Sequence, residues 1–150
     1  MDSTVIVAGM GFVAALLSAW LGARLQRKSD RDVRMLEARL RVYGECADSL
    51  YEYSRATYSR AKSRLAGRPE VERDQLRQAA YHCNARVRSA IGQAYILTGD
   101  LDLERRLSTV RRTVGTYNGV SDPDELKGLQ QQAYREINDA LEAARRHLVA

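Results

Sequence analysis

The hydrophobic pattern of the chain changes character once, close to residue 24. Residues 4–23 form an apolar run in which Thr4 and Ser18 are the only polar side chains. After this run, apolar residues recur at alternating steps of three and four, which is the spacing of one face of an α-helix. No segment shows the two-residue alternation of a half-buried β-strand. The pattern predicts an all-α protein, with one N-terminal transmembrane helix followed by an antiparallel cytoplasmic bundle of about four helical segments.

The apolar run has the length needed to cross a lipid bilayer. A helix over these twenty residues, at about 1.5 Å per residue, spans about 30 Å of hydrocarbon. Basic residues follow the run and Asp2 precedes it, so the positive-inside rule places the C-terminal side in the cytoplasm. We therefore expect a single-pass inner-membrane protein, with an anchor and basic flank over 1–28 and a bundle over 29–150. The residues expected at the lipid headgroups are Trp20, Arg24, Arg27, Lys28, Arg31 and Arg34.

Small residues recur along one face of the predicted span. In lipid, small side chains let helix backbones approach closely, and packing then drives association. This pattern favours self-association of the span. The alternative is that the small residues have no packing role, because alanine and glycine are common in transmembrane helices generally. The residues expected at such a packing face are Gly11, Ala15, Ser18, Ala19, Gly22 and Ala23.

Two other interpretations of the run remain open. A cleaved secretory signal would release an exported soluble helical protein, but such a signal begins with basic residues and has a shorter apolar core. Met1, Asp2 and Ser3 supply no positive charge. A buried helix of a soluble bundle would normally carry a polar edge, which this run lacks. The membrane span is the favoured interpretation.

Local signals divide the remaining chain into helices. A heptad seam runs from Val33 to Ala61, and a cap at Ser29 competes with an unbroken helix that continues from the apolar run, which we prefer. Gly67 and Pro69 predict a reversal into a second helix. Gly99 and Asp100 end that helix and cap a short third one, and Asp122 with Pro123 starts the last. The apolar faces expected to form the core of these later helices lie within 76–97, 103–114 and 126–148.

Composition adds little that indicates chemistry. The net charge of +5 comes mainly from arginine. Cys46 and Cys83 are too few for a disulfide framework, and an ideal hairpin would hold them about 9 Å apart along its axis, so separate thiols are expected. His82 and His147 have no metal-ligand spacing around them. Arginines on the short third helix, Arg105 and Arg106 among them, are interleaved with acids and predict a solvated face rather than a nucleic-acid surface.

No catalytic motif occurs in the sequence. Phosphate-binding loops, dinucleotide fingerprints, zinc-protease helices and nucleophile elbows are all absent from the printed chain. We therefore expect no enzyme activity, no cofactor, no metal, no nucleic-acid partner and no small-molecule substrate. Tyr51 and Tyr58 lie a heptad apart beside the first seam. Partial burial with the hydroxyl at the edge explains them best, and a face for a protein partner is the alternative.

The stretch LGARLQRKSDRDVR followed by EARLRVYGECADSLYEY resembles small single-pass membrane proteins of actinobacteria, in which an apolar N-terminus leads into an arginine-rich segment and a tyrosine-bearing helix. The resemblance implies membrane location and no catalytic residue. The leading hypothesis is a membrane-anchored helical interaction or scaffold protein that is not an enzyme, whose partners are the lipid bilayer and either a second copy or another protein. The alternatives are the exported soluble protein and an enzyme or regulator with a pocket inside the bundle.

Overall fold

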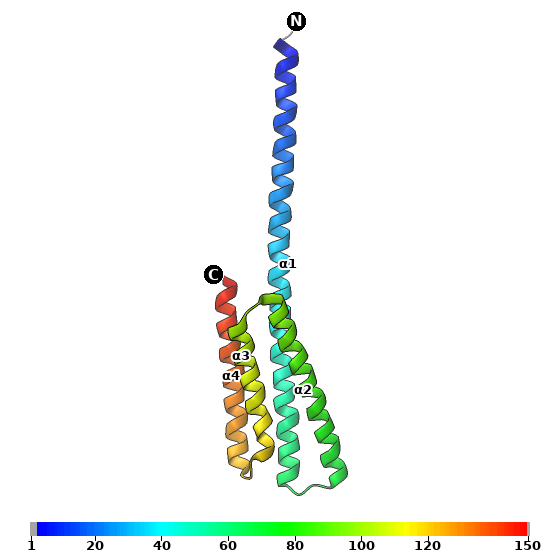
Figure 1. The fold of residues 1–150 in the computed structure, drawn as a ribbon, viewed down its shortest axis with the longest axis vertical. Helices are drawn as coiled ribbons and strands as arrows, with labels where there is room; N and C mark the ends of the chain where they lie inside the picture. Colours follow the sequence, from blue (N-terminus) through cyan, green and yellow to red (C-terminus); the bar gives the residue numbers. More distant parts are fainter. Residues whose placement is uncertain (1–2, 150) are drawn as a thin grey trace. The chain divides into compact units, whose positions relative to one another are not determined.

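The part of the protein that the structure describes consists of helices joined by short connections. The computed structural model describes the backbone of residues 3–149 and the side chains of residues 30–145. Within these residues there is no β-strand, so the predicted all-α class is confirmed. The elements, shown in Figure 1, are α1 (Ser3–Leu65), α2 (Glu70–Thr98), α3 (Leu101–Gly115), the short 3-10 helix η1 (Thr116–Gly119) and α4 (Pro123–Val149).

The chain divides into two compact units, residues 1–38 and residues 39–150. The first unit consists of the N-terminal part of α1. Helix α1 is a single helix from Ser3 to Leu65 and does not break at Ser29, as the preferred sequence interpretation predicted. Among the described residues, no helix combines the length and the apolar character that a membrane crossing requires. The side chains of the apolar run, residues 4–23, are not among the described side chains. The transmembrane span therefore stays a prediction.

The second unit is a bundle of helices joined by tight turns, as Figure 1 shows. Gly67 and Gly99 adopt left-handed backbone conformations, with φ of 61° and 66°, at the ends of α1 and α2. Residues with a β-carbon rarely adopt this conformation, so glycine is favoured there. Pro69 lies directly before Glu70, the first residue of α2, so the predicted reversal between the two helices is present.

Side-chain caps fix the start of the last two helices. The Asp100 carboxylate accepts a hydrogen bond from the Leu103 amide at 2.9 Å and thereby caps α3. The Asp122 carboxylate accepts from the amides of Asp124 and Glu125, both at 3.3 Å, at the start of α4. Each cap satisfies amide groups that the helix itself leaves without acceptors. Both predicted helix starts are confirmed.

The core follows three of the four predicted seams closely. The buried residues of α2 to α4 include Val87, Ala94, Leu107, Val114 and Ile137. The first seam is correct only from Tyr43 onward, because Val33, Leu36 and Leu40 are 52%, 41% and 53% exposed. Val33 and Leu36 belong to the first unit, in which α1 is the only helix. The prediction that Val33, Leu36 and Leu40 are buried was therefore wrong. Heptad spacing marks one face of a helix, but it does not show how far along that face other helices pack.

Candidate functional site

Most of the residues predicted to contact lipid lie outside the part of the chain whose side chains are described. This applies to Trp20, Arg24, Arg27 and Lys28, and to the whole packing face of small residues. Arg31 and Arg34 are within the described part, and both are exposed. The residues of the predicted packing face are Gly11, Ala15, Ser18, Ala19, Gly22 and Ala23.

The two heptad-spaced tyrosines are half-buried at the edge of the bundle. The Tyr51 hydroxyl donates to Asn138 Oδ1 at 2.8 Å, and the Tyr51 ring meets the Tyr134 ring edge to face at 5.1 Å. Burial raises the pKa of Tyr51 above its ordinary value, with the neighbouring Tyr134 adding to the effect and the Asn138 hydrogen bond opposing it. Tyr58 also packs against the core. Helix α4 therefore occupies much of the surface of Tyr51, and a partner face here is restricted to the exposed edges of both rings.

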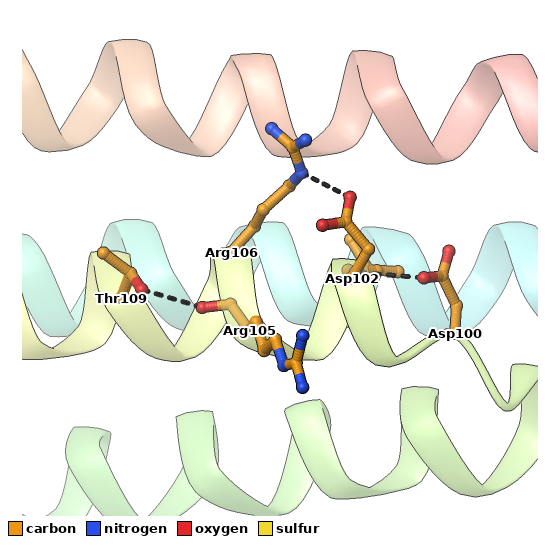
Figure 2. A network of polar contacts seen from close by, with 6 residues as sticks. Asp100, Asp102, Arg105, Arg106 and Thr109 are labelled. Carbon is orange, nitrogen blue, oxygen red and sulfur yellow. Dashed lines mark hydrogen bonds and ion pairs between the residues drawn. The ribbon is translucent and has the colours of Figure 1, made fainter.

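Polar contacts organise the first two turns of α3, as Figure 2 shows. Arg106 Nε donates to Asp102 Oδ2 at 2.7 Å, and this pairing raises the pKa of the Arg106 guanidinium. The Thr109 hydroxyl donates to the Arg105 carbonyl at 2.8 Å. In Figure 2 the Arg106 side chain extends toward α4, whereas the Arg105 side chain extends away from it.

A shallow groove of about 310 Å³ lies beside this network, between α3 and α4. Its walls carry Arg105 and Arg106 on one side and Glu136 and Asp139 on the other. Further along α3, Arg111 donates to Asn84 at 3.3 Å and Arg112 to Thr109 at 3.0 Å. The arginines of α3 are thus balanced by local acids and acceptors, which fits the solvated helix face predicted from the sequence.

A more strongly basic groove lies between the end of α1 and the beginning of α2. We call it the arginine groove. It has a volume of about 240 Å³, and it is lined by Arg60, Arg64, Arg73, Arg77, Glu70, Asp74 and Asn118. Sequence reasoning missed this cluster. Its signal was present in two arginine pairs, each with a spacing of four residues, on either side of the Gly67 turn.

Apolar side chains are exposed around the turn between α2 and α3. Ile96 is 84% exposed, and Tyr95 and Leu101 are 44% and 46% exposed. Tyr95 and Leu101 also line a groove of about 430 Å³ between α2 and α3. Isolated exposed apolar residues are common, but large ones gathered around a single turn are typical of interaction surfaces.

The described residues do not form a metal site, and their two cysteines are not arranged as reactive thiols. No group of three or more His, Cys, Asp or Glu side chains there could hold a metal ion. Cys46 and Cys83 are free thiols, as predicted. Cys46 is completely buried, and this burial raises the pKa of its thiol to about 12, so the reactive thiolate is disfavoured at neutral pH.

The fold and its surface therefore define a small helical-bundle protein with charged and apolar grooves on its exterior. The family model described as KilB plasmid transfer protein matches residues 40–148. This match covers well over half of the chain, and the protein belongs to the KilB plasmid transfer protein family. No curated protein and no solved structure matches the chain.

Proposed function

We propose that this protein acts in plasmid transfer as a membrane-anchored helical interaction module and is not an enzyme. The observation that carries the proposal is a coincidence of boundaries. The family model matches residues 40–148, and the helical bundle forms a compact unit over residues 39–150. The match to the family thus falls on the bundle, and the apolar run of residues 4–23 precedes the matched region.

Membrane anchoring is the part of the proposal that rests on sequence. The run has the length of a bilayer span, and the basic residues after it favour a cytoplasmic bundle. Five basic residues between Arg24 and Arg34 would lie beside anionic headgroups, where each contributes about 1 kcal/mol to binding. The bundle would then be held close to the inner face of the membrane, which DNA must cross when it is transferred between cells.

The interaction role rests on the surface of the bundle. The apolar residues around the turn between α2 and α3, with Ile96 as the most exposed, offer a contact area that the bundle itself does not cover. Interfaces of this type commonly use a few large apolar residues surrounded by a polar rim. No catalytic motif in the sequence competes with this interpretation.

A transfer assay separates the contributions of the anchor and the bundle. A plasmid from which this gene is deleted would be complemented with the full chain, with a chain lacking residues 4–23, and with that shortened chain fused to an unrelated transmembrane helix. We expect the full chain and the fusion to restore transfer and the shortened chain to fail while still accumulating. Full complementation by the shortened chain would contradict anchoring.

Two measurements complete the test. The full chain should sediment with membranes and require detergent for release, and N-terminal sequencing should find the apolar run still attached. A mature chain that begins after the run would instead support the exported soluble protein. In the same transfer assay, Ile96→Asp should reduce transfer, whereas Gln131→Asp, at an exposed position on α4, should leave it unchanged. Equal transfer by both variants would contradict a contact at the turn between α2 and α3.

A further inference from the structure

The arginine groove is lined by four arginines from two helices. Arg60 and Arg64 lie one turn apart on α1, and Arg73 and Arg77 lie one turn apart on α2. Like charges separated by four residues on a helix destabilise it, so two such pairs facing the same cavity carry an unfavourable energy that a bound anion would relieve. Four arginines against the carboxylates of Glu70 and Asp74 leave an excess of two positive charges in the lining.

Three of the four arginines are held in place by contacts within the bundle. The Arg60 guanidinium lies 5.5 Å from the centre of the Tyr81 ring. Arg64 donates to the Val120 carbonyl, and Arg77 pairs with Asp74 at 2.8 Å. Side chains that are already ordered lose less conformational entropy when a ligand binds. Part of the lining is therefore already in contact with the bundle before any ligand arrives.

The lining also restricts the kind of anion that fits. Guanidinium groups donate in a planar fork that matches phosphate oxygens, and the Asn118 side chain adds an amide donor. A phosphate monoester carries close to two negative charges at neutral pH, together with three acceptor oxygens. Its charge equals the excess in the lining, whereas a carboxylate or one phosphodiester of a DNA backbone supplies a single charge.

We propose that the arginine groove binds a phosphate dianion, either inorganic phosphate or the terminal phosphate of a small molecule such as a nucleoside monophosphate. This site is independent of the proposed role in plasmid transfer, because it depends only on the α1–α2 hairpin and η1. Occupancy would neutralise the groove and stabilise the end of the bundle where α1 turns into α2.

Titration of the detergent-solubilised full chain with inorganic phosphate tests the proposal. We expect saturable binding, measured by calorimetry and by a rise in Tm with phosphate concentration. Arg73→Gln should weaken binding by about tenfold to a hundredfold, since a charge-assisted hydrogen bond is lost. Arg73 stands outside the ion pairs of the described residues, and its loss relieves the repulsion with Arg77, so this variant should keep or slightly raise its Tm in phosphate-free buffer. Glu70→Gln should tighten binding, and Arg135→Gln, an equal charge change at an exposed position on α4, should leave it unchanged.

Further measurements distinguish inorganic phosphate from a small phosphorylated molecule as the ligand. Binding should weaken when the pH falls from about 8 to about 5, because inorganic phosphate changes over this range from mainly dianion to monoanion. A nucleoside monophosphate that binds more tightly than inorganic phosphate, with the same loss in Arg73→Gln, would identify a small phosphorylated molecule as the ligand. Absence of phosphate binding up to about 10 mM, or equal binding by wild type and Arg73→Gln, would overturn the proposal. Binding of a short DNA duplex without binding of inorganic phosphate would overturn it as well.

Discussion

The hydroxyl groups of Ser54 and Tyr117 lie 3.1 Å apart in the interior of the bundle, where they join α1 to η1. Both side chains are fully buried. The Tyr117 hydroxyl donates to the Leu129 carbonyl of α4 at 3.3 Å, so Ser54 is the donor in the contact with Tyr117. One phenol oxygen therefore links three helical elements that are distant in the sequence.

Replacing Tyr117 by phenylalanine removes this link and retains the ring. The Ser54 hydroxyl loses its acceptor and the Leu129 carbonyl loses a donor, and a buried polar group left without a partner costs about 1–3 kcal/mol. We expect Tyr117→Phe to lower the free energy of unfolding by about that amount in urea denaturation followed by circular dichroism. The double variant Ser54→Ala with Tyr117→Phe should lose less than the sum of the single losses. Additive losses would show that the two hydroxyls are not coupled.

The same tyrosine predicts how stability depends on alkaline pH. Burial raises the pKa of Tyr117 from its ordinary value of 10.0 to about 12, with the hydrogen bond from Ser54 opposing the shift. The folded state therefore keeps this proton over a pH range in which the unfolded chain has released it. Stability should be fully present below pH 10 and fall as the pH rises through about 12. Tyr117→Phe should show a shallower fall than wild type over this window, and identical slopes would contradict the assignment.

Helix ends were predictable because their chemistry is local. Gly67 and Gly99 supply left-handed conformations, and Asp100 and Asp122 supply caps within three residues of the amides that they satisfy. Each of these signals is complete in a short stretch of sequence. The seams of α2, α3 and α4 were predictable for a similar reason, since each helix buries one face over several turns; in α2 this face begins at Ala80.

Features that depend on where the helices end relative to one another were not predictable. Leu40 continues the heptad spacing of the core yet is 53% exposed. No pattern in the sequence predicted η1, which covers Thr116–Gly119 and buries Tyr117 completely. The arginine groove needs Arg64 and Arg73 to face one cavity from two helices, and no periodicity within one helix contains that information.

The two cysteines provide a probe of the folded core. Cys46 is completely buried and burial raises the pKa of its thiol, whereas Cys83 is only partly buried. A maleimide at neutral pH should therefore label Cys83 first and reach Cys46 only when the bundle unfolds. Labelling of Cys83→Ala across a urea titration should follow the unfolding curve from circular dichroism. Fast labelling of this variant without urea would mean that α1 opens locally around Cys46.

Two glycines should respond in opposite directions to the same substitution. Gly99 has a φ of 66° at the end of α2, and Gly128 lies inside α4 with open space where a β-carbon would be. Alanine at position 99 would be held in a left-handed conformation at a cost of about 1–2 kcal/mol. Alanine at position 128 should stabilise α4 by about 0.5–1 kcal/mol, because glycine loses more backbone entropy in a helix. Urea denaturation of Gly99→Ala and Gly128→Ala measures both effects with the same added atom, and a loss of stability in both variants would contradict the helical, uncrowded environment of Gly128.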